Sequence, residues 1–364
     1  MLDKTFSAST ISGSHLLLQV QVVLKALSKL AKIHLKVLLY RVTFCAKRYV
    51  FNVAKERNFY KFVFDFNYII NYKMKNNLLL FLFVLHGSVV FAQNMTDVSL
   101  FLRADSTTYL HEVSSNTGDL YRELGHHGPA IENEWLAIRY YFDKKAAIDV
   151  YSKANPGLEL AEYKWYPTTQ QQLDGMGADY YKVGPTVGLG GIRLWDGENV
   201  LPLDPVSKRT ARVVKEGSIS YLEMLSEDVP YLNGTVDVLV RVTVYSGFRK
   251  AKVEAYALSD KDVEFVTGIN YHRGQDVVIE DDCVFAWGLH PEDVAAEQVE
   301  LGSAIFINSE DYSQAMDDGN QHIFISKPAR YLSLWISSAN GKEPFVNTLD
   351  SFIDFSKIEI GLDK

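Results

Sequence analysis

The chain has 364 residues, and its 37 Lys and Arg against 45 Asp and Glu give a formal net charge of −8 at pH 7. The charge is uneven: residues 1–73 hold 12 basic and 3 acidic side chains, net +9, whereas residues 93–364 hold 24 and 42, net −18. A negative field of that size excludes nucleic acid as an expected partner of residues 93–364, because phosphates need basic contacts. An anionic ligand would require a local basic cluster.

Residues 74–92, MKNNLLLFLFVLHGSVVFA, have the pattern of a secretory signal peptide. Lys75 precedes an apolar run at residues 78–85, and small residues stand before Gln93. The run is shorter than the roughly 20 residues that span a bilayer. We therefore expect residues 1–73 to be an upstream extension of the reading frame, residues 74–92 to be removed, and residues 93–364 to be periplasmic or, alternatively, secreted. A basic arm at residues 1–73 is the alternative, but it would block export.

Residues 93–364 contain one cysteine, Cys283, so no intramolecular disulfide is possible and stability must come from an apolar core. No further apolar stretch is long enough to predict a membrane span. Neither the composition nor any pattern predicts an oligomeric state.

Short alternating runs rich in Tyr, Phe, Val and Ile predict β-strands throughout this region. The clearest run is residues 236–245, in which one face carries Val236, Val238, Val240, Val242 and Val244. Further strands are expected at residues 135–142, 147–151, 251–258, 263–271, 303–308, 322–326 and 332–336. Turn dipeptides separate them at Asp196-Gly197, Asn233-Gly234, Asp318-Gly319 and Asn340-Gly341.

Helical patterns are short and are expected only at residues 292–299, 309–316 and 349–355. Many short strands with regular turns favour an all-β fold over an α/β fold. The sequence predicts one catalytic domain at residues 93–364, an antiparallel β-sandwich with few short helices.

Common cofactor and metal motifs are missing from the sequence. The Gly-rich segment at residues 188–191 lacks the Lys-Ser/Thr of a phosphate loop, and no Gly-x-Ser-x-Gly elbow or zinc signature is present. The acidic pairs at residues 281–282 and 317–318 lack a calcium-loop pattern. No cofactor and no metal are predicted.

The first candidate site is the loop at residues 125–128, Gly-His-His-Gly. Flanking glycines would allow close approach of a ligand to His126 and His127. If the next residues form one strand, one face carries Asn133, Trp135, Arg139 and Tyr141, and the other carries Glu132 and Glu134. The alternative is that both histidines merely hydrogen-bond the loop.

Two further segments combine aromatic, basic and imidazole side chains. Residues 270–274 place Tyr271, His272 and Arg273 at a strand end, and Asn270 shares a face with His272. Residues 180–184 and 191–197 interleave Tyr181 and Trp195 with Lys182 and Arg193, which suits a sugar that carries an acid group. Ordinary strand core with surface cations is the alternative. His111 and His290 are weaker candidates.

Three of these runs together, GHHGPAIENEWLAIRYYFD, KVG with LGGIRLWDG, and TGINYHRG, resemble a family from polysaccharide-utilisation loci of marine Bacteroidota. That family was long a domain of unknown function and includes an oligosaccharide dehydratase of ulvan breakdown. The resemblance covers most of residues 96–364. It implies loss of water from a saturated uronic acid at the non-reducing end of an anionic ulvan oligosaccharide, giving a 4,5-unsaturated uronyl unit.

Elimination across C4 and C5 of a uronic acid has three requirements: the carboxylate must be neutralised, the C5 proton removed and the 4-oxygen protonated. Arginine suits the first task and histidine the other two.

The sequence hypothesis assigns these roles to particular residues. His127 and His272 form the acid–base pair, with Tyr271 as an alternative acid and His126 as an orienting or binding group. Carboxylate and sugar binding falls to Arg139, Arg273, Lys182, Trp195 and Tyr181. A polysaccharide lyase and a non-catalytic carbohydrate-binding module remain the rival functions.

Overall fold

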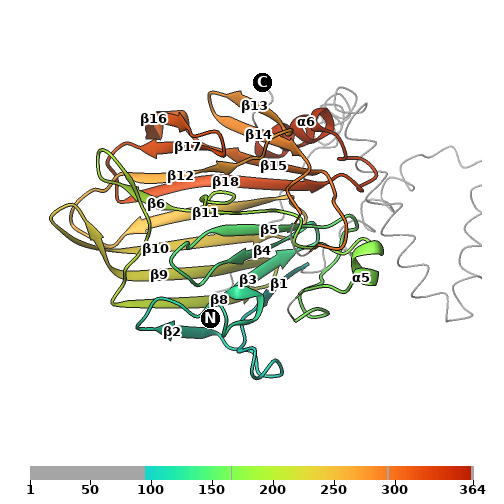
Figure 1. Ribbon diagram of the computed structural model, residues 1–364, viewed down its shortest axis with the longest axis horizontal. Helices are drawn as coiled ribbons and strands as arrows, with labels where there is room; N and C mark the ends of the chain where they lie inside the picture. Colours follow the sequence, from blue (N-terminus) through green and yellow to red (C-terminus); the bar gives the residue numbers. More distant parts are fainter. Residues whose placement is uncertain (1–94, 165, 293–294, 362–364) are drawn as a thin grey trace, which may run out of the picture. The chain divides into compact units, whose positions relative to one another are not determined.

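The computed structural model describes residues 95–164, 166–292 and 295–361, all within one compact unit of the chain, residues 92–364 (Figure 1). The predicted extension at residues 1–73 and the predicted signal peptide at residues 74–92 lie outside the described residues. No helix in the part that the structure describes is long and apolar enough to cross a bilayer.

The described residues form three sheets, and every pair of neighbouring strands in them is antiparallel. The four-stranded sheet has the order β1 (Thr96–Ser99), β3 (Ala130–Asn133), β4 (Leu136–Tyr140), β5 (Ile148–Ser152). The five-stranded sheet has the order β16 (Tyr312–Asp317), β17 (Gln321–Ser326), β12 (Phe265–Asn270), β6 (Arg193–Trp195), β7 (Val200–Leu201). The nine-stranded sheet has the order β13 (Asp276–Glu280), β14 (Cys283–Gly288), β15 (Leu301–Phe306), β18 (Tyr331–Asn340), β11 (Lys250–Ala257), β10 (Gly234–Tyr245), β9 (Ile219–Tyr231), β8 (Lys208–Glu216), β2 (Glu112–Ser115).

The long strand β10 lies within the nine-stranded sheet and confirms the predicted alternation. Its five valines are buried, whereas Leu239, Arg241 and Tyr245 on the opposite face are only partly buried. Such a strand buries one face against a second layer of structure. The valines accordingly join the main core, which also takes residues from both smaller sheets.

The two smaller sheets are linked by the Gly-rich segment. Gly188 forms a bridge to Ile148 of β5, and Leu189 forms a bridge to Ile269 of β12. Gly188 has a φ of +73°, and a Cβ there would lie 2.1 Å from the Ile148 carbonyl oxygen, so no other residue fits. The predicted all-β sandwich is confirmed.

Helices are few, and two of the three predicted ones are wrong. Described residues 292 and 295–299 contain no helix, because so short a segment cannot form one by propensity alone. Residues 309–316 give one 3₁₀ turn, Ser309–Asp311, and then strand β16, whose pairing with β17 overrides the local pattern. A short helix that was not predicted, α5 (Thr169–Leu173), begins at a capping box on Thr168.

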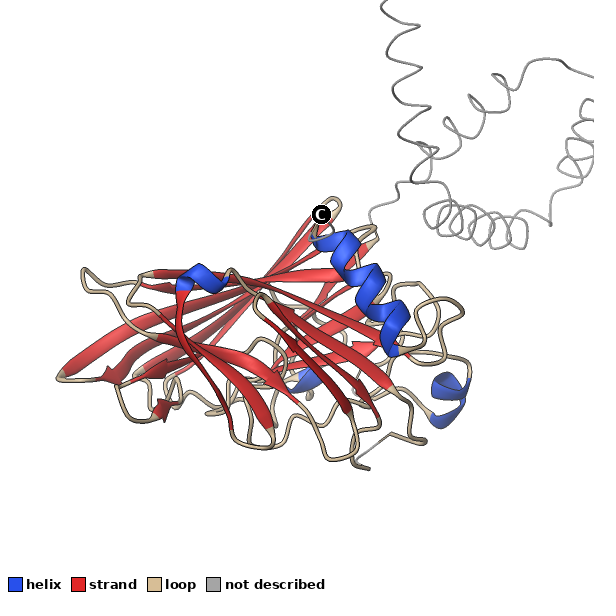
Figure 2. Cartoon of the chain, turned by 90° about the horizontal axis from the view of Figure 1, so that it is seen from above, coloured by secondary structure: helices blue, strands red, loops and turns tan. Residues whose placement is uncertain are grey.

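The predicted C-terminal helix is confirmed and extends further, as α6 (Leu349–Ile360). Thr348 caps its first turn and Gly361 ends it with a φ of +85°. Its Phe352 packs on Phe285 and Trp287 of β14, so α6 covers the side of the nine-stranded sheet that does not carry the main core (Figure 2).

A tight turn at residues 134–135 corrects the predicted faces of this region. The Asn133 side chain accepts hydrogen bonds from the backbone of Trp135 and Leu136, so the chain reverses between β3 and β4. In the resulting hairpin Ala130 opposes Arg139 and Glu132 opposes Ala137. Glu132 and Arg139 therefore share a face, opposite to the prediction, because a hairpin resets the alternation.

That face carries a buried ionic cluster. The Lys153 ammonium pairs with Glu132 and donates to the carbonyl oxygens of Asn133 and Gly157 at 2.8 and 2.7 Å, with both side chains fully buried. Glu132 also accepts from the backbone N–H of Glu159 at 2.9 and 2.8 Å. The cluster fastens the segment that follows β5 to strand β3. Tyr163 and Tyr166 come later in the same segment.

Replacing Lys153 with Met should lower the free energy of unfolding by about 3–5 kcal/mol, because Glu132 would be left as a buried unpaired carboxylate. Urea unfolding measures the change. Lys208→Met is the matched control: its ion pair with Glu227 is 3.9 Å long and its side chain is 45% exposed, so the loss should be at most about 1 kcal/mol. Equal losses in the two variants would contradict this account.

Candidate active site

The His-His loop forms a single 3₁₀ turn, Gly125–His127, that holds both imidazoles inside the protein. His126 and His127 have φ values of 55° and 63°, in the left-handed region, and side chains that are 0% and 7% exposed. Non-glycine residues in this conformation cost about 1–3 kcal/mol each and concentrate at functional sites. Two consecutive strained, buried histidines make this loop the leading candidate for a site.

The flanking glycines serve packing, not ligand access as the sequence suggested. A Cβ on Gly125 would lie 2.1 Å from the Phe101 ring, and one on Gly128 would lie 2.0 Å from the Tyr140 carbonyl oxygen. Any larger residue would therefore push the loop off its neighbours. The glycines fix where the histidines lie.

His127 and Tyr166 form a hydrogen-bonded dyad. The Nδ1 of His127 lies 3.0 Å from the carbonyl oxygen of Tyr121, which can only accept, so Nδ1 carries the proton. The Nε2 of His127 is then the acceptor for the Tyr166 hydroxyl at 2.9 Å. The Tyr121 ring stacks on the imidazole at a centroid distance of 3.9 Å and fixes its plane.

The pKa values of the dyad fix its protonation state at neutral pH. Burial, followed by the charge of Arg139, lowers the pKa of His127 to about 4. Burial raises the pKa of Tyr166 above its ordinary value. A neutral imidazole base therefore faces a protonated phenol.

His126 has different surroundings and lies deeper. Its Nε2 lies 3.1 Å from the Ser99 hydroxyl, and its ring packs edge-on against Phe101. Burial, followed by Arg139, lowers its pKa to about 3. His126 thus anchors the loop.

Arg139 lies behind the dyad in a fully buried ion network. Its guanidinium pairs with Asp149 and, at 2.9 Å, with Asp179, and the Tyr141 hydroxyl donates to Asp149 at 2.9 Å. Its guanidinium also lies 5.7 Å from the centre of the Tyr166 ring. Two carboxylates already match its charge, so the geometry corrects the expectation of a direct substrate clamp and makes Arg139 a positioning residue.

Other basic side chains near the loop supply a positive field. The charges of Arg103 and Lys145 contribute to lowering the pKa of His127, and that of Lys164 to lowering the pKa of His126. Arg103 is exposed and Lys145 half-buried. The net −18 of residues 93–364 is therefore locally offset beside the dyad, as an anionic ligand requires.

A second imidazole pair lies beside strand β12, and the backbone of Lys182 orients both rings. The Lys182 N–H donates to Nδ1 of His290 at 3.1 Å, and its carbonyl oxygen accepts from Nε2 of His272 at 2.9 Å. The Asn270 amide donates to the same carbonyl at 2.8 Å. The two rings meet edge-to-face at 4.8 Å, and the Tyr181 ring lies 4.6 Å from His290.

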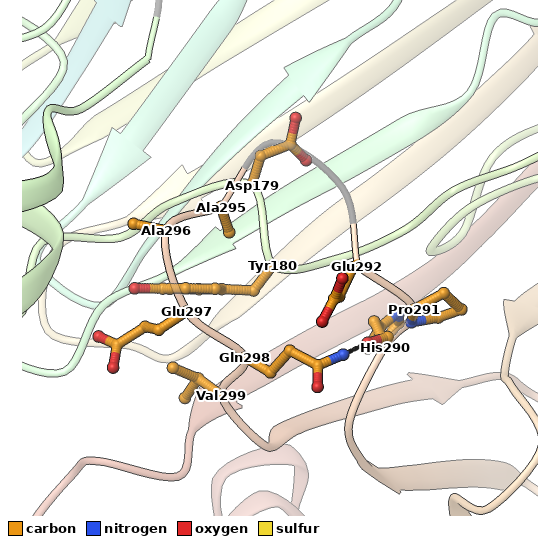
Figure 3. A pocket seen from close by; sticks show the side chains of 10 residues that line it. All are labelled: Asp179, Tyr180, His290, Pro291, Glu292, Ala295, Ala296, Glu297, Gln298 and Val299. Atoms are coloured by element: carbon orange, nitrogen blue, oxygen red, sulfur yellow. Dashed lines mark hydrogen bonds between the residues drawn. The ribbon is translucent and has the colours of Figure 1, made fainter.

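One residue connects the two histidine groups. Asp179 pairs with Arg139 of the first group and lines a cavity of about 230 Å³ that His290 of the second group also lines (Figure 3). Tyr180 and Gln298 contribute further to this cavity. The segment at residues 179–182 therefore joins the dyad, the cavity and the second imidazole pair into one candidate site.

Residues 92–355 match the family model described as domain of unknown function DUF4861. The chain belongs to this family. No curated protein matches the chain.

Solved structures give distant likenesses to the DUF4861 chain. A putative aldose 1-epimerase from Klebsiella pneumoniae subsp. pneumoniae MGH 78578 has 8% identity and a TM-score of 0.36, over 72% of this chain and 96% of its own. A putative kojibiose phosphorylase from human microbiome has 12% identity and a TM-score of 0.39, over 73% and 36%. The heparan sulfate lyase HepC from Pedobacter heparinus has 10% identity and a TM-score of 0.30, over 59% and 34%. The chain thus spans about a third of the last two proteins, and likenesses this distant say nothing about activity.

Both predicted sugar platforms of the DUF4861 chain are buried side chains. Trp195 packs in a separate cluster with Val266, Ile323 and Ile325. Tyr181 is 1% exposed and cannot serve as a sugar platform, and neither can Trp195 at 8%. Their burial corrects both expectations.

The side chains at the end of β12 point to different surroundings. His272 turns toward Lys182, whereas Tyr271 donates from its hydroxyl to Asp317 on a different strand. Arg273 is exposed in the following turn. His272 has hydrogen-bond partners distinct from those of His127, so the two members of the expected acid–base pair have separate surroundings, and the hydrogen-bond partner of His127 is Tyr166.

Tyr166, Asp179 and His290 are the functional candidates that sequence reasoning missed or ranked low. Tyr166 follows β5 in an irregular segment, and Asp179 directly precedes the Tyr-Tyr-Lys run that drew attention. No local pattern reveals a partner 39 residues away, as Tyr166 is from His127. Within the described residues no group of three His, Cys, Asp or Glu side chains could hold a metal ion.

Imidazole ¹⁵N NMR should find His127 neutral, with Nδ1 protonated, and with a protonation midpoint near pH 4, because burial and Arg139 disfavour its charged form. A folded-state pKa below the unfolded value of about 6.5 means that this histidine supports folding at neutral pH, and that its contribution is lost as pH falls from 6.5 toward 4. A midpoint near 6.5, or a proton on Nε2 at pH 7, would contradict the geometry of the dyad.

Proposed function

We propose that this DUF4861 protein is a carbohydrate-active lyase of the hydro-lyase type that removes water from a saturated uronic acid at the non-reducing end of an anionic oligosaccharide. The observation that carries the proposal is the His127–Tyr166 dyad: a neutral base and a protonated phenol 2.9 Å apart in a locally positive environment. The resemblance of the His-His loop implies an ulvan oligosaccharide as substrate. The signal-like segment at residues 74–92 favours a periplasmic site of action, with secretion as the alternative.

The dyad accounts for both proton transfers of the elimination. His127 Nε2 takes the C5 proton, and the electron pair of the broken C5–H bond forms the C4=C5 double bond. The C4–O bond breaks, the departing oxygen takes the Tyr166 proton, and water is released. The proton held by His127 then returns to the Tyr166 phenolate through their hydrogen bond, which restores the starting state.

Neutralising the substrate carboxylate is the remaining requirement, because it makes the C5 proton acidic. Arg103 and Lys145 are the cations whose charges already act on His127. Arg139 contributes indirectly by pairing with Asp179 and by lying over the Tyr166 ring. These roles replace the clamp first expected from Arg139.

A polysaccharide lyase would use the same proton abstraction but expel a sugar in place of water. The dyad suits either leaving group, so the products distinguish the two activities. Dehydration keeps the chain length and a lyase shortens it.

A carbohydrate-binding module is the second candidate function, and one observation favours it. Aromatic pairs lie on the outer face of the nine-stranded sheet: Tyr256 with Tyr331 at 5.0 Å and Tyr245 with Trp335 at 5.8 Å. The Lys250 ammonium lies 4.5 Å from the Trp335 ring. Exposed aromatic rings can stack on sugar rings without catalysing a reaction. Binding without turnover would support this alternative.

The purified protein, given oligosaccharides that end in a saturated uronic acid, should yield products of unchanged length that have lost one water and gained ultraviolet absorbance. His127→Ala and Tyr166→Phe should each lower kcat by about 10²–10⁴-fold, because each removes one proton-transfer group. Mass spectrometry and absorbance measure both effects.

His111→Ala is the matched control, since His111 is exposed, and it should keep wild-type turnover. Shortened products would establish a lyase. Wild-type turnover in both dyad variants would remove the dyad from the mechanism.

The dyad also predicts the stereochemistry. Its two groups are hydrogen-bonded to each other, so both act from one face of the sugar ring. In glucuronic acid the C5 proton and the 4-oxygen lie on the same face, whereas in iduronic acid they lie on opposite faces. kcat/KM should be about 10²-fold higher for glucuronyl than for iduronyl termini, and equal or reversed values in matched disaccharides would contradict single-face elimination.

A further inference from the structure

Helix α6 covers only part of the outer face of the nine-stranded sheet, the face that does not carry the main core. The helix packs on β14 through Phe352, and its last turn reaches Lys250, whose ammonium donates to the Glu359 carbonyl oxygen at 2.8 Å. Strands β11, β10, β9 and β8 follow one another in the same sheet (Figure 1). Their core-side residues are mostly buried, and their outer residues are mostly exposed or half-buried. We call the outer side of these four strands the β8–β11 face.

One row of side chains crosses the β8–β11 face with alternating charge. The register places Arg212 of β8 opposite Glu223 of β9. Arg241 of β10 lies between Glu223 and Glu254 of β11. The order across four neighbouring strands is therefore plus, minus, plus, minus. Arg241 Nε donates to Glu223 at 2.9 Å, whereas the Arg212 guanidinium lies 3.9 Å from that carboxylate and its side chain is 55% exposed. Arg212 thus has room for a second carboxylate.

An alternating row of this kind is complementary to itself. A two-fold axis parallel to the strands, between β9 and β10, reverses the strand order in a second copy laid face to face. β8 of one copy then lies over β11 of the other, and β9 lies over β10. Arg212 of one copy faces Glu254 of the other, and Arg241 faces Glu223 in the same way. Symmetric dimers use the same patch on both subunits, which requires such self-complementarity.

Apolar side chains on both sides of the charged row follow the same symmetry. Leu225 of β9 lies opposite Leu239 of β10, and Ile219 of β9 lies opposite Tyr245 of β10. The axis sets each member of a pair over the other member in the second copy, so that apolar surface meets apolar surface. Ile219 is 38% exposed, and the other three are half-buried. Burial of these side chains would favour association.

The sheet order leaves room for α6 in this arrangement. Strand β2 is an edge strand and lies over β18, so β14 and most of the helix packed on it extend past the edge of the second sheet. Packed sheets lie about 10 Å apart and are rotated by about 30°. The long Arg and Glu side chains of the charged row can span such a gap.

Net charge also distinguishes the β8–β11 face. Residues 93–364 carry a net charge of −18, so two copies repel each other over much of their surface. The outer positions from 210 to 216 of β8, and the positions aligned with them on β9 to β11, instead carry four basic and three acidic side chains: Arg212, Arg241, Lys250, Lys252, Glu216, Glu223 and Glu254. Lys252 pairs with Glu254 of its own copy at 2.8 Å. Two copies therefore approach here with little repulsion.

We propose that the β8–β11 face is a two-fold interface between two copies of this chain, with the Arg212–Glu254 and Arg241–Glu223 contacts at its centre. The interface is independent of the proposed function. The four-stranded sheet next to the His127–Tyr166 dyad packs on the opposite, core side of β10. The contact between copies therefore does not involve the dyad.

Sedimentation velocity of the purified protein between about 1 and 100 μM measures the association. We expect a concentration-dependent dimer with a Kd of about 10 μM or lower. Arg212→Glu and Glu254→Arg should each raise that Kd about tenfold or more, because either change sets like charges against each other at two symmetric contacts. Lys327→Glu is the matched control: it makes the same charge change at an exposed residue after β17, outside the face, and should dimerise as wild type does.

A mixture of the two variants tests the symmetry itself. The carboxylate introduced at position 212 of one copy then faces the guanidinium introduced at position 254 of the other. At the second contact the unchanged Arg212 and Glu254 face each other. Dimer formation should therefore return to within about threefold of wild type, although each variant alone associates weakly. A folding defect in either variant cannot produce this rescue.

Three results would overturn the interface: a wild-type monomer at about 100 μM, variants that dimerise as tightly as wild type, or a mixture that stays monomeric. A monomer that binds oligosaccharides with a fluorescence change that Trp335→Phe abolishes would assign the face to a sugar and exclude the dimer. Each of these measurements is made without turnover, so the interface and the proposed function stand or fall separately.

Discussion

The buried ion network of Arg139 is the interaction on which the candidate site depends. The guanidinium pairs with Asp149 from β5 and with Asp179 from the segment that follows α5, and it lies over the Tyr166 ring as well. Burying a charge of this kind costs several kcal/mol unless its partners are well placed. The network therefore requires β4, β5 and two irregular segments to take one arrangement, in which Asp179 connects Arg139 to the cavity.

The rest of the local structure supports this arrangement by packing. Gly125 and Gly128 press the His-His turn against Phe101 and Tyr140, which offsets the strain of its left-handed backbone. The Lys153–Glu132 pair fastens the segment that leads to Tyr166. Each of these contacts fixes one backbone segment, and none of them requires contact with a substrate.

Much of the fold followed from the sequence because strand alternation is local. The valines of β10 and the Asp318-Gly319 turn between β16 and β17 predict strand positions and one buried face. The turn between β3 and β4 escaped prediction because it contains neither Gly nor Pro, and Asn133 closes it with its side chain. Residues 309–316 escaped because pairing with β17 outweighed their helical pattern.

The sequence predicted the site less completely than it predicted the fold. The His-His loop was found because two adjacent histidines between glycines are unusual, and His272 because it stands at a strand end. Tyr166 and Asp179 stand in irregular segments, and their importance arises only from contacts with residues 39 and 40 positions away. Tyr181 and Trp195 were overrated, since aromatic residues next to cations can also fill a core, as both do here.

The central claim is that the uronyl ring binds over the His127–Tyr166 dyad. A crystal structure of the Tyr166→Phe variant with a saturated glucuronyl disaccharide tests it most directly. The account predicts the uronyl C5 about 3–3.5 Å from His127 Nε2, a near-attack distance. A uronyl ring bound at Tyr271 and Arg273, or on the outer face of the nine-stranded sheet, would contradict it.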